Sequence, residues 1–244
     1  MNHPNTVCIV QARMGSRRLP GKVLSDLDGH PMLDQIIWRL KRAQTLDRIV
    51  VATSDQPKDQ RIIEHCAAQG HDCFAGNHED VLDRFAQAAE LFAADLIVRI
   101  TADCPLIDPR IVDQTVALMQ ADKSLDYACN FFPKRTFPRG LDVEVVTRST
   151  LDEINKTTSD PRLREHVTLA IYESSNRFRI GSVTSDQDWS ELRWTVDEPA
   201  DLKLVQEIYA TFAGRPFFWR DCLMAYRRHP QWRELNSHIA QKAA

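Results

Sequence analysis

A loop of twelve residues near the N-terminus, 11–22, concentrates cationic side chains and glycines. Its four cations and two glycines are Arg13, Arg17, Arg18, Lys22, Gly15 and Gly21. Arginine forks and a lysine point charge bind phosphate oxygens, and glycine lets backbone amides approach an anion closely. A solvated basic loop is the structural alternative. Four cations within ten residues, in a chain of formal charge -3, favour a polyphosphate site.

The spacing within this loop differs from the familiar glycine-rich phosphate motifs. Five residues, rather than four, separate Gly15 from Gly21, and Val23 stands where a P-loop needs Ser or Thr to hold magnesium. The three-glycine fingerprint of dinucleotide-binding proteins does not occur in the loop either. The loop therefore predicts a phosphate site of another kind at the end of a strand.

Two aspartates follow predicted strands and are candidate magnesium ligands. Asp103 comes just after the run 96–100, and Asp197 just after 192–196. Ligands of open α/β sheets bind outside the carboxyl ends of the strands, where carboxylates would hold magnesium against phosphates. A turn at Asp103 and a helix N-cap at Asp197 are the alternatives. Asp108, which a proline follows, is most simply an N-cap and is left out of the site.

A second polar group could bind an acceptor substrate. Asp142 and Glu144 share one face of a predicted strand because side chains alternate with a period of two. With Arg139, Arg164 and His166 they could form a pocket for an anionic acceptor. A buried polar network that supports the sheet fits the same pattern equally well. Both interpretations stay open at the level of sequence.

Cysteines and histidines predict neither a disulfide framework nor a zinc site. The six cysteines have no paired spacing, which is typical of reduced thiols. The grouping of His65, Cys66, His71, Cys73 and His78 matches no paired zinc-ligand pattern. We therefore expect a cytoplasmic protein with free thiols.

The elements that must position these residues follow from the apolar pattern. Strand-like runs are expected at 7–10, 49–52, 73–74, 96–100, 143–146, 179–184 and 192–196, and helical-period stretches at 32–40, 58–69, 81–92, 162–172 and 202–212. This alternation predicts one α/β domain with a mostly parallel sheet, helices on both faces and a small inserted substructure. The aromatic and basic stretch 217–232 predicts an amphipathic helix packed on the body or on a dimer mate.

Composition bounds the class of protein. Hydrophobic residues at 43% and charged residues at 27% are ordinary for a globular chain of 244 residues. A formal charge of -3 argues against a nucleic-acid-binding protein. No apolar run has the length of a membrane span, so no membrane partner is expected.

The basic loop also resembles a family motif. Ala12-Arg13-x-x-Ser16-x-Arg18-Leu19-Pro20-x-Lys22 is similar to the signature of the CTP-dependent cytidylyltransferases that activate sugar acids such as sialate and KDO. The chain resembles most closely the branch of spore-coat polysaccharide biosynthesis cytidylyltransferase-like proteins. The resemblance extends from Val7 to about Phe212 and includes the segments 79–84, 100–106, 137–144 and 194–199.

The resemblance implies a fold, an activity and site residues. It implies a Rossmann-like nucleotidyltransferase domain, assigned to 1–214, with a helical tail over 215–244. The implied reaction is Mg²⁺-dependent transfer of CMP from CTP to an acidic sugar or other anionic acceptor, with release of pyrophosphate, in surface polysaccharide synthesis. A homodimer is a family expectation.

The implied roles are assigned residue by residue. Asp103 and Asp197 would hold magnesium and, with Arg13 and Lys22, form the catalytic set. The nucleotide-binding residues would be Ala12, Arg13, Gly15, Ser16, Arg18, Lys22, Asp83, Arg84 and Asp103. A surface salt bridge remains the alternative for Asp83 and Arg84, because adjacent side chains of a helix diverge. Two other functions stay open: a nucleotide-sugar glycosyltransferase, which usually needs an Asp-x-Asp pair, and a non-catalytic nucleotide-binding protein.

Overall fold

Every residue from Val7 to Val10 is apolar and fully buried, the pattern of a strand covered on both faces. In the computed structural model, which describes residues 3–240, β1 (Thr6–Gln11) lies between β4 (Arg48–Ser54) and β6 (Leu96–Thr101) and runs parallel to both. These three strands form the centre of the sheet. Their carboxyl ends meet at one edge, where the basic loop begins.

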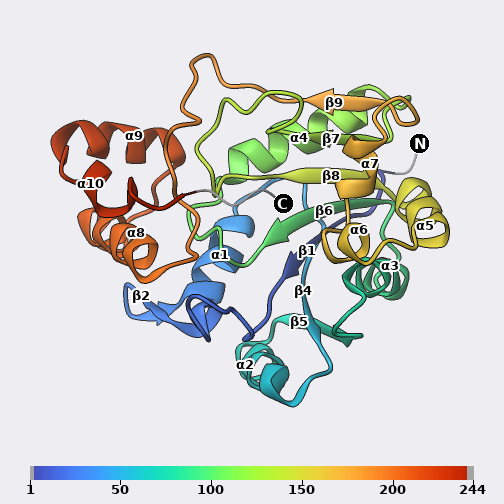
Figure 1. Cartoon of the computed structure of the whole chain (residues 1–244), viewed down its shortest axis with the longest axis horizontal. Helices are drawn as coiled ribbons and strands as arrows, with labels where there is room; N and C mark the ends of the chain where they lie inside the picture. The colour runs from blue at the N-terminus through green and yellow to red at the C-terminus, as the bar shows by residue number, and fades with distance from the viewer. Residues whose placement is uncertain (1–2, 241–244) are drawn as a thin grey trace.

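The full sheet has seven strands in the order β5-β4-β1-β6-β8-β7-β9 (Figure 1). The outer strands are β5 (Asp72–Gly76), β7 (Tyr127–Cys129), β8 (Glu144–Thr147) and β9 (Ile180–Ser182). Within this sheet β8 runs antiparallel to both of its neighbours, and the other pairings are parallel. A separate two-stranded hairpin, β2 (Asp26–Leu27) and β3 (His30–Pro31), follows the short 3₁₀ helix η1 (Lys22–Leu24). The mostly parallel α/β fold predicted from the sequence is confirmed.

Helices cover both faces of the sheet because alternate strand residues point to opposite sides. Cys8 and Val10 pack with α1 (Met32–Leu40) and α4 (Pro109–Ala121), whereas Val7 and Ile9 pack with α3 (Val81–Leu91) and α5 (Arg148–Thr157). Short elements complete the layers: η2 (Pro57–Asp59), α2 (Gln60–Gln69), α6 (Pro161–Glu165) and α7 (Leu169–Glu173). Figure 1 shows α3, α5 and α6 grouped at one end of the molecule, away from the C-terminal helices.

Three local predictions differ from the structure. The helix expected over 162–172 is two short helices, because Val167 between them has a left-handed φ of 55°. The segment 192–196 is extended but makes a single bridge, Arg139 to Arg193, instead of a strand pairing. Finally, the sequence pattern gave no indication of β7, a three-residue strand.

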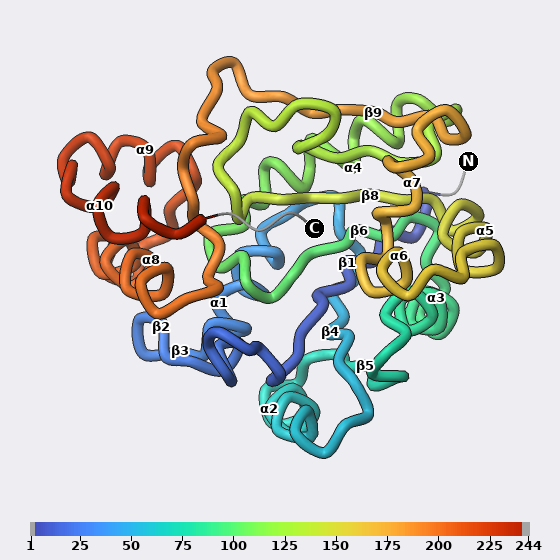
Figure 2. Tube along the Cα trace, viewed as in Figure 1, coloured from blue at the N-terminus to red at the C-terminus, as the bar shows by residue number. Residues whose placement is uncertain are grey.

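The C-terminal tail packs on the body of the same chain. After α8 (Pro199–Phe212), α9 (Trp219–Arg228) and α10 (Trp232–Asn236) fold back beside it, as Figure 2 shows. Trp219, Cys222, Tyr226 and Trp232 are buried in the same apolar cluster as α1 and α4. The assigned division at residue 214 stays a prediction, and residues 241–244 of the tail lie outside the described part. Within residues 3–240, no helix is both long and apolar enough to cross a membrane.

Candidate active site

The basic loop is folded around the buried side chain of Met14. The Met14 amide donates to the buried carboxylate of Asp59 over 2.7 Å, which ties the loop to the segment after β4. The Met14 carbonyl accepts from the amides of Ser16 and Gly21, both over 3.0 Å. Gly21 adopts a φ of 73°, which glycine allows at no steric cost, and it lies over the Met14 side chain. The loop is thereby closed on itself.

Lys22, at the end of this loop, joins the two predicted aspartates. Its Nζ atom lies 3.3 Å from Asp103 Oδ2 and 2.9 Å from Asp197 Oδ1, and it donates to the Val196 carbonyl over 2.6 Å. The side chain is only 10% exposed. Burial opposes its charged form, but the attraction of Asp103 and Asp197 outweighs burial and raises the pKa of Lys22. The ammonium is therefore held charged between two carboxylates.

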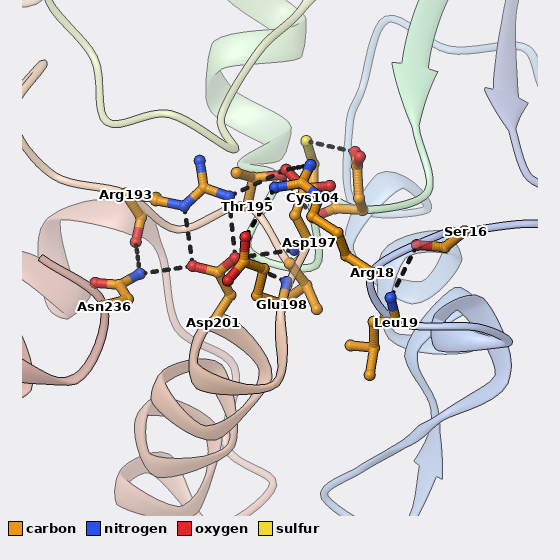
Figure 3. A network of polar contacts seen from close by, with 12 residues as sticks. Ser16, Arg18, Leu19, Cys104, Arg193, Thr195, Asp197, Glu198, Asp201 and Asn236 are labelled. Atoms are coloured by element: carbon orange, nitrogen blue, oxygen red, sulfur yellow. Dashed lines mark hydrogen bonds and ion pairs between the residues drawn. The ribbon is translucent and has the colours of Figure 1, made fainter. Parts of the chain in front are cut away.

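Asp197 is bound from three sides by cations, as Figure 3 shows in part. Its Oδ2 lies 3.2 Å from Arg18 and 3.0 Å from Arg193, opposite the bond to Lys22. Burial raises the pKa of the Asp197 carboxyl, yet Lys22, followed by Arg18 and Arg193, lowers it below its usual range overall. The carboxylate is thus ionised and faces the basic loop.

Asp197 is not the N-cap of α8, because its neighbours Glu198 and Asp201 cap that helix. The fully buried Asp201 accepts from the amides of Asp197 and Glu198, each over 3.0 Å, and so caps α8 in a capping box with Glu198. Asp201 also holds Arg193 over 2.9 Å, and Asn236 of α10 donates to Asp201 over 2.9 Å (Figure 3). The C-terminal tail therefore buttresses the residues that hold Asp197.

Asp103 contributes the second carboxylate of the site, and its backbone holds the segment that leads to Asp197. Its Oδ1 accepts from the Thr101 hydroxyl over 2.6 Å, which orients the carboxylate. Its backbone carbonyl accepts from the Val196 amide over 2.8 Å, which attaches the segment leading to Asp197. Gly140 lets this segment approach closely, because a Cβ atom there would lie 2.5 Å from the Thr195 nitrogen. Two residues distant in sequence are thus fixed beside each other.

These groups open into a cavity of about 710 Å³ at the carboxyl edge of the sheet. Its lining includes predicted residues from the loop and both aspartates: Arg13, Gly15, Ser16, Arg17, Arg18, Lys22, Asp103 and Asp197. It also includes Lys58 and His78, which sequence reasoning did not assign to a substrate, and Glu165, the sequence neighbour of the predicted acceptor residues Arg164 and His166. Arg13 lies 3.6 Å from Glu165 across the cavity. A smaller cavity of about 330 Å³ lies at the opposite end of β4, away from the carboxylates.

Three predicted nucleotide-binding residues lie outside the lining. The Ala12 amide donates to the Ala52 carbonyl over 3.0 Å, so it extends the strand pairing and is not free to bind phosphate. Arg84 is buried and donates to the carbonyls of Asn77 and His78, which fixes the loop that presents His78. Asp83 accepts from the side-chain amides of Gln87, one turn along α3, and of Asn155 on α5. For the two helical residues, a direct nucleotide contact stays a prediction.

The five predicted acceptor residues also lie outside this lining. Glu144 is buried and accepts from Arg99, Tyr127 and Thr168, while Asp142 forms an ion pair with Arg135.

The other three occupy separate places. Arg164 binds Asp80 over 2.8 Å and two backbone carbonyls, so its guanidinium is fully engaged. Burial lowers the pKa of Arg139, which borders Gly140, and burial likewise lowers the pKa of His166, which adjoins Glu165. An acceptor role for all five stays a prediction.

A cationic loop and two carboxylates at the carboxyl edge of a mostly parallel sheet are features of an α/β protein that binds phosphates at that edge. The family model for cytidylyltransferases matches residues 7–208. The chain belongs to the cytidylyltransferase family.

Individual relatives agree with this assignment. The chain is 33% identical over 217 residues to the spore coat polysaccharide biosynthesis protein SpsF of Bacillus subtilis, covering 85% of this chain and 88% of SpsF. It is 34% identical over 237 residues to an uncharacterised protein of Methanocaldococcus jannaschii, covering 96% of each. A 3-deoxy-manno-octulosonate cytidylyltransferase of Pelobacter propionicus is 36% identical over about half of each chain, 51% and 48%.

Solved structures have the same fold. A cytidylyltransferase from Leptospira borgpetersenii superposes with a TM-score of 0.91 at 29% identity, covering 99% of this chain and 100% of that one. A CMP-2-keto-3-deoxy-manno-octonic acid synthetase solved with CTP superposes with a TM-score of 0.64 at 22% identity, covering 85% of this chain and 99% of that one. At 22% identity, the similarity to this synthetase shows a shared fold.

Sequence reasoning missed the residues that support the aspartates. Asp201 had a usable signal, since Glu198 followed by an acid three residues later is a capping-box pattern. Arg193 and Asn236 had none, because their contacts with Asp201 span different elements. Lys58 was assigned to the start of a helix, whereas it lies in η2 beside the basic loop.

Proposed function

We propose that this protein transfers CMP from CTP to an anionic acceptor, releasing pyrophosphate, in the synthesis of a surface polysaccharide. The observation that carries the proposal is the convergence of Lys22, Asp103 and Asp197 at a cavity rich in cations. The relatives named for CMP-sugar-acid synthesis and for spore coat polysaccharide synthesis support the choice of nucleotide and pathway class.

The reaction needs positioning and charge neutralisation more than covalent chemistry by the protein. An acceptor oxygen attacks the α-phosphorus of CTP in line. The bond to the oxygen that bridges the α- and β-phosphates breaks, and pyrophosphate leaves with the bonding electrons. Arg13, Arg18 and Lys22, which line the cavity, would bind the phosphates, and Lys22 is kept charged by its two carboxylates.

The donor set at Asp103 and Asp197 fits magnesium. Both side chains supply the hard oxygens that Mg²⁺ prefers, and their approach to one ammonium nitrogen supports a shared cation. Asp103 and Asp197 would hold the ion, which would neutralise charge on the phosphates when bound. The chain's own part is to orient these carboxylates through Thr101, Arg193 and Arg18.

The test is pyrophosphate release with Mg²⁺, each of the four nucleoside triphosphates, and a panel of sugar acids and phosphonates. We expect release with CTP and one acceptor, abolished in Asp103→Ala and retained in Asp152→Ala, which removes an exposed aspartate of α5. Nucleotide binding without release from any pair would instead support the non-catalytic binding protein. Release that survives Asp103→Ala would refute the assigned site.

A further inference from the structure

Lys58 reaches the cavity from outside the basic loop. It belongs to η2, between β4 and α2, and its side chain lines the same 710 Å³ cavity as Arg13, Arg18 and Lys22. A Cβ atom at Gly15 would lie 2.8 Å from the Lys58 Nζ and 3.2 Å from its Cε. The lysine side chain therefore crosses directly over the Gly15 backbone, in space that only glycine leaves open.

The segment that carries Lys58 is fixed to the basic loop. The adjacent Asp59 is fully buried, accepts from the Met14 amide over 2.7 Å, and also binds the Ser54 hydroxyl. The Asp59–Met14 hydrogen bond thus joins the segment that leads to α2 to the loop after β1. The Lys58 backbone is therefore held against the loop, and only the side chain remains adaptable.

Of the cations that line the cavity within residues 3–240, Lys58 and the loop residue Arg17 have side chains with spare bonding capacity, whereas the others are paired. Lys22 is bound by two carboxylates, Arg18 by Asp197 and Glu198, and Arg13 lies near Glu165. Within residues 3–240, the Lys58 side chain makes no hydrogen bond or ion pair, and it is exposed to the cavity. An ammonium without a protein partner, beside a glycine and facing a cationic cavity, has the chemistry of an anion ligand.

We propose that Lys58 binds the terminal phosphates of the nucleotide and then the departing pyrophosphate, with Gly15 leaving the space it needs. This inference rests on the proposed function. Lys58 would contact the end of the triphosphate that leaves, whereas Lys22 lies beside the aspartates. The family signature in the basic loop does not include Lys58, since that motif ends at Lys22.

Binding of inorganic triphosphate with Mg²⁺, measured by calorimetry, tests the proposal without depending on the nucleobase. We expect Lys58→Ala to weaken binding of inorganic triphosphate, CTP and pyrophosphate about tenfold or more, and Lys58→Arg to retain most of it. Binding of CMP should stay within about twofold, because CMP lacks the terminal phosphates. The matched control is Arg61→Ala, which removes an exposed cation of α2 outside the cavity lining.

A double-mutant cycle tests the link to Gly15. Gly15→Ala should weaken triphosphate binding in the wild-type background, because the new methyl group would displace the ammonium. It should have little further effect in the Lys58→Ala background. Equal losses in both backgrounds would refute the role assigned to Gly15.

The outcomes separate this inference from the proposed function. Triphosphate binding by Lys58→Ala that equals wild type, or a loss that Arg61→Ala reproduces, overturns the role of Lys58 while leaving the transferase intact. A wild-type protein that binds neither CTP nor inorganic triphosphate overturns the proposed function itself.

Discussion

Two carboxylate clusters lie beside the central strands and differ in access. In the cluster around Lys22, Asp103 and Asp197 are 28% and 19% exposed and face the cavity. In the cluster around Glu144, the carboxylate is 6% exposed, and both of its oxygens are occupied by Arg99, Tyr127 and Thr168. Both contain charged pairs, yet only the first can exchange its partners for a ligand.

The difference shows that residue type alone does not identify a site. Asp142 and Glu144 have the same alternation that an acceptor pocket would need, but Glu144 points into the sheet and binds β6 and β7. Gln11 connects the clusters, since it accepts from Arg99 over 3.0 Å and also lines the cavity. The cluster around Glu144, here called the closed cluster, therefore supports Gln11 in the wall of the cavity. The cluster around Lys22, which faces that cavity, is called the open cluster.

The largest effect is expected from breaking the closed cluster. Glu144→Gln would leave the buried Arg99 guanidinium without its carboxylate, and we expect the free energy of unfolding to fall by about 3–5 kcal/mol. Urea denaturation followed by circular dichroism measures it. The control is the double replacement Arg99→Met with Glu144→Met, which should recover part of the loss because no unpaired charge remains, although Tyr127 and Thr168 lose their acceptor. A single-variant loss below about 1 kcal/mol would mean that this pair behaves like an exposed one.

Breaking the open cluster should affect activity more than stability. Lys22→Met removes a cation that we propose binds the phosphates, and we expect pyrophosphate release with CTP to fall about 10²–10³-fold. Arg18 and Arg193 remain paired with Asp197, so the melting temperature should change less than in Glu144→Gln. An unchanged rate of pyrophosphate release in Lys22→Met would contradict the expectation that the cluster around Lys22 serves activity and the cluster around Glu144 serves stability.

Local sequence signals predicted the centre of the fold well and its periphery less well. β1 and β4 contain continuous apolar runs, and β6 is interrupted only by Arg99 between Leu96 and Ile100, because both faces of these strands are covered, so each is recognisable alone. The alternating apolar residues of 192–196 also predicted a strand. This segment instead packs against Gly140 and Asp103 and does not join the sheet. The break at Val167 also depends on a distant contact, since the next residue, Thr168, binds Glu144.

In the site, too, the residues with a local sequence signal could be predicted, and their distant contacts could not. The loop cations are contiguous in sequence, and Asp103 and Asp197 end predicted strand runs, so these residues could be predicted. The contact that shifts the pKa values of Lys22 and Asp197 could not be predicted, because these two residues meet across 175 positions of sequence. For Lys58, the decisive fact is its position over Gly15, which no spacing encodes.

The pH dependence of stability should distinguish the open cluster in a second way. The folded-state pKa of Asp197 is lowered from its ordinary 3.8, so its stabilising effect is complete above that value and is lost as the pH falls through the folded pKa. Lys22, with a pKa raised from 10.5, stabilises fully below that value and loses its effect as the pH rises through its folded pKa. We expect Asp197→Asn to flatten the acid limb of stability below about pH 4, measured as urea midpoints. An acid limb identical to wild type would show that Asp197 is not held by these cations.

The smallest effect is expected at a surface ion pair, which serves as a reference for the effects of substitutions in both clusters. Arg148 and Asp152 lie one turn apart on α5 at 2.9 Å, with side chains 29% and 35% exposed. Water and salt screen such a pair, so Arg148→Ala should change the free energy of unfolding by only about 0.3–0.5 kcal/mol and leave pyrophosphate release unchanged. The same urea and activity assays apply, repeated at high salt, where the difference from wild type should vanish. A loss approaching that of Glu144→Gln would mean that burial is not what separates the clusters, because this pair has the same charges without the enclosure.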